Sequence, residues 1–165
     1  MKQLKLTGKY GAGKVVLVDD GDFLKVCDTK WALTKLGYPL KTTFETGKSH
    51  ATRKAKTVYL HRVILNAPKG MVVDHINQNK LDNRKSNLRV ATHGQNHLNQ
   101  GPQKNNTSGY KGVVWAKSKN KWSSRLKVNG KNVFLGYFEK PLSAAIAYNL
   151  KAKELFGEFA LLNNV

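Results

Sequence analysis

Asp74 and His75 stand side by side after a short apolar run, residues 71–73, and have the chemistry to hydrolyse a phosphodiester bond. That reaction needs a base to deprotonate water and a cation to neutralise charge on the phosphate and the leaving oxygen. His75, whose unperturbed pKa is about 6.5, can be a neutral base near physiological pH. Asp74 offers a carboxylate oxygen and Asn96 an amide oxygen, ligands that magnesium accepts. The residue types therefore indicate a small metal-dependent phosphodiesterase site.

The elements that must position these side chains follow in the order strand, loop, strand, helix. Residues 71–73 and 88–91 have the β-branched, apolar character of strands, and the Asn-rich span between them is typical of a loop. Thr92 precedes Gln95 at capping-box spacing, which predicts a helix with Asn96 in its first turn.

One geometric condition applies to the Asp-His pair. Neighbouring residues of a regular strand point to opposite faces. Asp74 and His75 can therefore address one phosphate only if the strand ends or distorts at this point. The polar residues 76–79 that follow favour an ending.

The stretch from about residue 59 to 99 resembles the HNH nucleases of the ββα-metal class, in particular the homing endonucleases of phages and introns. Their motif runs Asp-His, Asn-Leu-Arg and a helical Asn, and all three parts occur here in that order. The resemblance implies that His75 is the general base, that Asp74 and Asn96 hold one divalent metal, Mg²⁺ or Mn²⁺, and that Asn87 pins the loop.

A His-Arg pair before the site, His61-Arg62, resembles the pair that precedes it in homing HNH proteins. We assign His61 to the motif's structure, and Arg62 and Arg89 to DNA contacts. His93 and His97 stand four apart, as in zinc-binding pairs, but Gly94 replaces the Glu of the zinc-protease motif. We expect no zinc.

The net charge of +19 implies a polyanionic partner, with an affinity that falls steeply with salt. Between residues 46 and 138 only two acids, Asp74 and Asp82, stand against 18 Lys and Arg. The single cysteine, Cys27, excludes an internal disulfide. No apolar run is long enough for a membrane span and no secretory signal is evident, so we expect a cytoplasmic protein that is not secreted.

Residues 1–57 read as a β-rich region of uncertain role, with strands over residues 14–18, 31–33 and 38–44. The acidic residues 19–22 read as a turn or a helix start leading into residues 23–26, and a solvated turn is favoured over a calcium loop. The basic stretch 46–56 reads as a hairpin tip or a phosphate-contacting loop.

The C-terminal part follows a polar linker, residues 101–108. Three strands are expected within residues 110–138, with Asn129-Gly130 as a tight hairpin turn, and a helix begins near Pro141 and ends at Gly157. This pattern resembles the AP2 DNA-binding domain over residues 109–163. The resemblance implies that the sheet contacts DNA through Lys111, Trp115, Lys117, Lys121, Arg125 and Lys127.

We therefore predict an α+β protein: an N-terminal region (1–57), an HNH core (58–100), the linker (101–108) and an AP2-like domain (109–165). The predicted function is a homing-type, nicking DNA endonuclease that acts as a monomer on double-stranded DNA, with no small-molecule cofactor and no membrane partner. The alternatives are a non-catalytic DNA-binding regulator built on the same domains and a basic RNA-binding protein.

Overall fold

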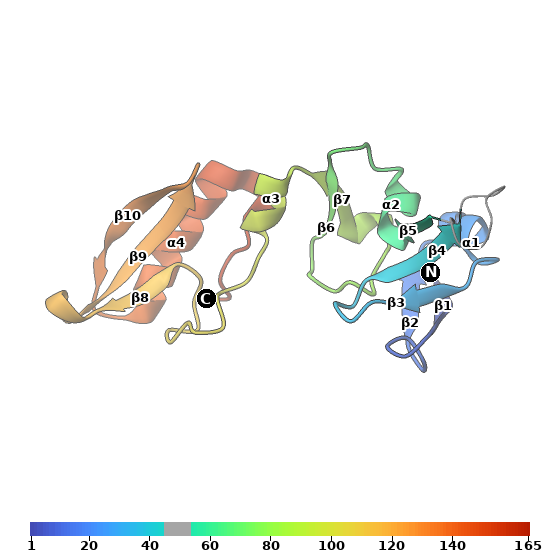
Figure 1. Cartoon of the computed structure of the whole chain (residues 1–165). Coiled ribbons are helices and arrows are strands. Elements are labelled where there is room, and N and C mark those ends of the chain that lie inside the picture. The colour runs from blue at the N-terminus through green and yellow to red at the C-terminus, as the bar shows by residue number, and fades with distance from the viewer. Residues whose placement is uncertain (45–53) are drawn as a thin grey trace. The chain divides into compact units, whose positions relative to one another are not determined.

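The computed structural model describes residues 1–44 and 54–165, and it divides the chain into two compact units, Met1–His93 and Gly94–Val165 (Figure 1). The predicted excursion at residues 46–56 lies largely outside the described residues. Within the described residues, no helix is long and apolar enough to cross a membrane.

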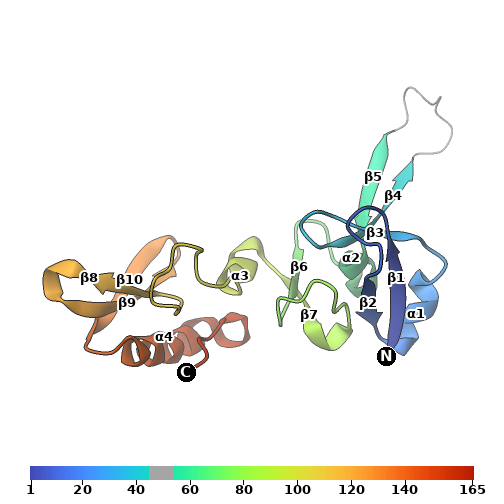
Figure 2. The same ribbon diagram turned by 90° about the horizontal axis from the view of Figure 1, so that it is seen from below.

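The first unit is built on a five-stranded sheet in the order β2-β1-β3-β4-β5 (Figure 2). Its strands are β1 (Lys2–Thr7), β2 (Val15–Val18), β3 (Trp31–Leu33), β4 (Pro39–Phe44) and β5 (Ala55–Tyr59). The strands predicted at residues 14–18, 31–33 and 38–44 are therefore present. Two short helices, α1 (Asp20–Val26) and α2 (Leu60–Leu65), complete this part of the fold.

The nuclease region adds a two-stranded antiparallel ladder to the same unit. Its strands are β6 (Val72–His75) and β7 (Leu88–Ala91), and a 3-10 turn, η2 (Lys85–Asn87), precedes β7. One hydrophobic core joins this ladder to the N-terminal sheet, since Val73 and Leu88 belong to the same buried cluster as Leu4, Val16 and Trp31. Residues 1–57 and the nuclease region thus fold around a common core.

The helix start predicted at residues 19–22 is confirmed, since α1 begins at Asp20, but the expectation that these acids are solvated is wrong for Asp22. Asp22 is only 2% exposed and forms ion pairs with Lys25 and Lys85 at 2.7 and 2.9 Å. Asp19 accepts a hydrogen bond at 2.8 Å from the backbone N–H of Lys85. The first turn of α1 therefore anchors the turn that leads into β7.

The second unit holds most of α3 (His93–Leu98) and a three-stranded antiparallel sheet in the order β10-β9-β8, packed against α4 (Pro141–Phe156). Its strands are β8 (Val113–Ala116), β9 (Lys121–Val128) and β10 (Lys131–Phe138), with short 3-10 turns η3 (Lys117–Lys119) and η4 (Gly157–Phe159). Asn129 and Gly130 both have positive φ, 48° and 82°, as a tight type I′ hairpin requires. The predicted strands and helix are present, and the AP2 relationship itself stays a prediction.

Candidate active site

The Asp-His pair lies at the end of β6. Asp74 pairs with Arg89 and His75 with Leu88 in the antiparallel ladder, and the chain then turns, with the Gln78 N–H donating to the His75 carbonyl at 2.9 Å. Gln78 takes a left-handed φ of 63° in this turn. Both residues thus pair in regular register, and the strand ends directly after His75 rather than between them.

Asp74 is buried, and its charge is paired with that of Arg89, the residue opposite it in the ladder. The Arg89 Nη2 and Nε atoms donate to Asp74 Oδ2 at 2.7 and 2.9 Å, and the two side chains are only 11% and 6% exposed. Such a charge-assisted pair fixes the orientation of the carboxylate. Arg89, assigned to DNA from the sequence, makes an intramolecular contact in the structure.

His75 lies among aromatic rings. Its ring centroid is 5.3 Å from that of His61 and 6.2 Å from that of Tyr38. Burial lowers the pKa of His75, against the opposing effects of the Asn83 side chain and of the neighbouring carboxylates. A lowered pKa keeps the imidazole neutral at physiological pH, the state that a general base requires.

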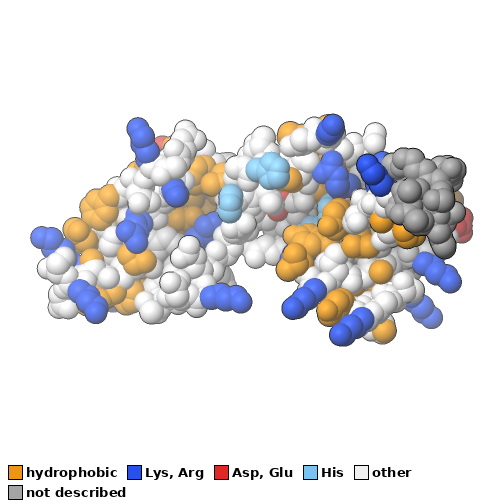
Figure 3. Space-filling model, in the orientation of Figure 1, with side chains coloured by type: hydrophobic (Ala, Val, Ile, Leu, Met, Phe, Trp, Pro, Cys, Tyr) orange, Lys and Arg blue, Asp and Glu red, His pale blue; other side chains and the backbone are white. Residues whose placement is uncertain are grey.

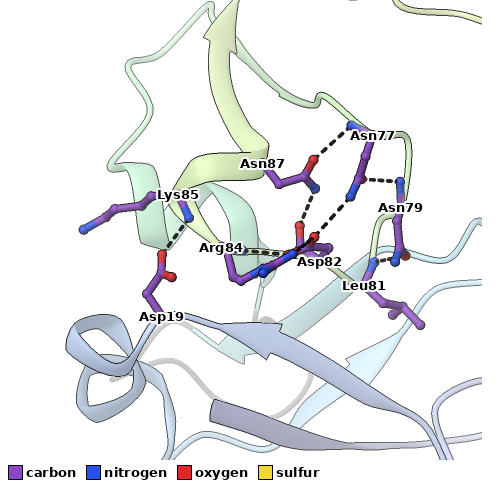
Figure 4. A network of polar contacts seen from close by, with 8 residues as sticks. All are labelled: Asp19, Asn77, Asn79, Leu81, Asp82, Arg84, Lys85 and Asn87. Carbon is purple, nitrogen blue, oxygen red and sulfur yellow. Dashed lines mark hydrogen bonds and ion pairs between the residues drawn. The ribbon is translucent and has the colours of Figure 1, made fainter. Parts of the chain in front are cut away.

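The loop between β6 and β7 is held by amide side chains and one buried carboxylate (Figure 4). Asn87 Oδ1 accepts the Asn77 N–H at 2.9 Å, and Asn87 Nδ2 donates to the Asp82 carbonyl at 2.8 Å. Asp82 is 2% exposed and accepts from Arg84 Nε and Nη2 at 2.7 and 2.6 Å. Arg84 and Asn77 together hold the pKa of the Asp82 carboxyl below its usual range, with Arg84 the larger cause. The network fixes both ends of the loop that follows His75.

The His-Arg pair lies in α2. His61 is 7% exposed, and burial, with smaller effects from His75 and Arg62, lowers its pKa to about 4, so it is neutral at physiological pH. Arg62 donates to the carbonyls of Met71, Ala67 and Pro68 at 2.6, 3.1 and 3.0 Å. Arg62 thus holds the turn that leads into β6, and its assignment to DNA stays a prediction.

The donor chemistry at the end of β6 fits a hard divalent cation. The buried Asp74 carboxylate is already oriented, and a single carboxylate leaves most of a magnesium shell for water and phosphate oxygens. Among the described residues, no three His, Cys, Asp or Glu side chains gather as a metal-binding group. Asn96, the other predicted ligand, is half-buried in α3, within the second unit.

The sheet of the second unit has two chemically different faces, set by its register. Leu126 and Ala144 lie in the buried clusters between the sheet and α4. Arg125 pairs across the ladder with Phe134, so these two lie on the opposite, outward face. Lys121 and Lys127 lie on the same face, because they stand an even number of residues from Arg125 in β9.

A bulge in β10 adds an aromatic pair to the outward face. Residues three apart in a regular strand point to opposite faces, but the register shifts between Phe134 and Gly136. Tyr137 therefore joins Phe134, with ring centroids 4.9 Å apart, and both are about half exposed. The one local signal of this bulge in the sequence is Gly136.

The other predicted contacts of the second unit are differently placed. Trp115 pairs with Trp122, with ring centroids 5.1 Å apart, and so lies on the face toward α4. Lys117 lies in η3, beyond the end of β8. The structure thus brings together Lys121, Arg125 and Lys127 but not Trp115.

A cavity of about 510 Å³ opens beside β8 and β9. Its lining includes Arg125, Lys127 and the half-buried Lys111, whose ammonium donates to the Leu98 carbonyl. Burial lowers the pKa of Lys111 to about 8.

Lysine and arginine side chains outnumber acids on the face drawn in Figure 3, as expected for a chain with a net charge of +19.

Along the chain, a strand that ends in Asp-His, a pinned Asn-rich loop, a returning antiparallel strand and a helix follow one another, in the order predicted from the sequence. The sequence model of the HNH endonuclease family matches residues 58–98. The chain is 37% identical over 155 residues to an uncharacterized HNH endonuclease of Acanthamoeba polyphaga mimivirus, an alignment that covers 94% of this chain and 78% of that protein.

A second relative is protein 3.8 of Escherichia phage T7, 35% identical over 94 residues, which are 56% of this chain and 76% of that protein. The chain belongs to the HNH endonuclease family and is an enzyme, an endonuclease. Enzymes of this family depend on a metal ion and act on DNA.

Proposed function

We propose that this enzyme is a homing-type endonuclease that nicks one strand of double-stranded DNA, with His75 as general base and with Asp74 and Asn96 as ligands of one Mg²⁺ or Mn²⁺ ion. The observation that carries the proposal is the Asp-His pair at the end of β6. One residue is a buried, oriented carboxylate and the other an imidazole whose pKa is lowered by burial.

In this reaction the imidazole of His75 takes a proton from the attacking water, which it can do only in its neutral state. Arg89 orients Asp74 through the two hydrogen bonds to Oδ2. Asn87 and Asp82 fix the loop after His75, which keeps the base in place. The bound metal would neutralise charge on the phosphate and on the leaving oxygen.

We propose that the outward face of the β8–β10 sheet contacts the duplex. Lys121, Arg125 and Lys127 supply cations there, and Phe134 and Tyr137 supply exposed rings. A sheet of this kind fits the major groove. Phosphate contacts would position the protein, while the side chains of this face would supply any sequence preference.

The test is relaxation of supercoiled plasmid with magnesium, with manganese and with EDTA. We expect metal-dependent nicking that is lost in His75→Ala, while the DNA affinity stays within about twofold. Asp74→Asn should also lose the activity, whereas Asp20→Asn, at an exposed aspartate of the same unit, should retain it. Unchanged nicking by His75→Ala would remove His75 from the mechanism.

The competing function is a non-catalytic DNA-binding regulator. A pure binder needs neither a general base nor a metal ligand, although Asp74 would still stabilise its fold through the pair with Arg89. Absence of nicking by the wild type on any DNA, with binding intact, would favour the regulator.

A further inference from the structure

The turn between β3 and β4 brings Tyr38 to the general base, although residues 1–57 carry no part of the HNH motif. The Thr34 N–H donates to the Tyr38 carbonyl at 3.0 Å, and the Tyr38 N–H donates to Thr34 Oγ1 at 2.9 Å. Gly37 completes the turn with a φ of 86°, a value that favours glycine. The backbone on both sides of Tyr38 is therefore fixed.

Lys80, in the loop that follows His75, ties this turn to the nuclease site. Its ammonium donates to the Leu36 carbonyl at 2.8 Å and lies 4.2 Å from the centroid of the Tyr38 ring. A cation at this distance from an aromatic face is attracted to it. Two segments 44 residues apart in the chain are thus joined beside the Asp-His pair.

The Tyr38 ring forms one wall around the imidazole of His75. The two centroids are 6.2 Å apart, and Tyr38 also contacts His61 at 5.6 Å and Tyr59 at 6.2 Å. His61 in turn stacks on Tyr59 at 5.5 Å and meets His75 edge-on at 5.3 Å. All these separations lie within the range of attractive aromatic pairs.

We infer that Tyr38 is a positioning residue for catalysis, whose ring holds the imidazole of His75 in the orientation that accepts the proton of the attacking water. The inference rests on the proposed role of His75 as base. It assigns the N-terminal region a part in the reaction, because β3, β4 and the turn between them deliver this ring. Positioning of the imidazole requires the aromatic ring of Tyr38 and does not require its phenolic hydroxyl.

The test compares Tyr38→Leu and Tyr38→Phe in the full chain, under single-turnover conditions with magnesium and a duplex that the wild type cleaves. A displaced catalytic group can cost about 10²-fold in rate, so we expect Tyr38→Leu to lower the single-turnover rate constant by about that factor. The Kd for DNA, measured with calcium in place of magnesium, should change less than about twofold. Tyr38→Phe should cleave within about threefold of the wild type.

Tyr10→Leu is the matched control, because Tyr10 is an exposed tyrosine in the turn between β1 and β2 of the same unit. It should leave the rate unchanged. A rate for Tyr38→Leu within threefold of the wild type would overturn the inference, and so would an equal loss in Tyr38→Phe or a parallel loss of DNA affinity. If His75→Ala is inactive in the same assay, such a result contradicts the role of Tyr38 and leaves the proposed function standing.

A second variant covers the case in which Tyr38→Leu does not fold. Lys80→Met removes the ammonium that joins the turn to the loop and keeps the length of the side chain. We expect a loss of about tenfold in the single-turnover rate with unchanged Kd. An unchanged rate would overturn the inference.

Discussion

Asp74 and Arg89 face each other across the β6–β7 ladder, and two nitrogens of Arg89 donate to one carboxylate oxygen, Oδ2, at 2.7 and 2.9 Å. The proposed metal ligand therefore has a protein partner of opposite charge. Both side chains are almost fully buried, so neither charge is well solvated by water. The pair holds the carboxylate in one orientation and lowers the cost of burying it.

Removal of Arg89 should therefore destabilise the fold. Breaking a buried pair leaves an uncompensated charge, and such changes cost about 3–5 kcal/mol. We expect Arg89→Met to lower the free energy of unfolding by about 3 kcal/mol, measured by urea denaturation in EDTA. The double variant Asp74→Leu/Arg89→Met should be more stable than Arg89→Met alone, since it removes both charges.

The matched control is Lys5→Met, an exposed cation on β1 of the same unit. It should leave the urea midpoint unchanged. Equal stability of Arg89→Met and the wild type would show that the pair contributes nothing to the fold.

His61 should make the protein sensitive to mild acid. Its pKa is about 4 in the folded state, against a usual value of 6.5, so the folded state favours the neutral ring. The contribution of neutral His61 to the free energy of unfolding is fully present above pH 6.5 and is lost as the pH falls toward 4. Between pH 7.5 and 5 the loss is about 2 kcal/mol, from 1.36 kcal/mol for each pH unit below 6.5.

Urea denaturation at pH 7.5 and 5 measures this effect. His61→Phe keeps a ring and cannot be protonated, so its stability should fall less than that of the wild type. His97→Phe, at an exposed histidine, should retain the full loss. Identical pH dependence in His61→Phe and the wild type would assign the acid sensitivity to other groups.

The sequence was informative where local pattern decides structure. Strand character around residues 72–75 and 88–91, the Asn129-Gly130 turn and Pro141 at the start of α4 depend on near neighbours, and all three predictions are confirmed. The order of the HNH motif also indicated the endonuclease family, which the matching family model and the mimivirus relative confirm.

The sequence was uninformative where distant segments meet. Tyr38 reads as an ordinary strand aromatic, and only the packing of the β3–β4 turn against Lys80 brings it to His75. Asp22 reads as a surface acid, and its burial depends on Lys85, 63 residues away. The bulge that turns Tyr137 to the outward face has no signature in local composition beyond Gly136.

The anchor between α1 and the η2 turn should contribute to stability. Asp22 is 2% exposed, while its partners Lys25 and Lys85 are about half exposed, so solvent screening weakens both ion pairs. We expect Asp22→Asn to lower the free energy of unfolding by about 1 kcal/mol. Asp20→Asn, at an exposed aspartate of the same helix, should have no measurable effect, and equal behaviour of the two variants would contradict the anchor.

The outward face of the β8–β10 sheet should account for part of the salt dependence of DNA binding. Each cation that neutralises a phosphate contributes about 0.9 to the slope of log K against log salt concentration. We expect Arg125→Ala to weaken binding and to reduce that slope by about one, measured by fluorescence anisotropy on a duplex over a range of KCl concentrations.

Lys131→Ala is the matched control. Lys131 is also exposed on the same sheet, but its pairing with Val128 places it on the face toward α4. Its removal should leave the slope unchanged. Equal effects of the two substitutions would mean that DNA binding depends on the total charge of this unit and not on the face that carries it. An effect of Lys131→Ala alone would place the duplex on the opposite side of the sheet.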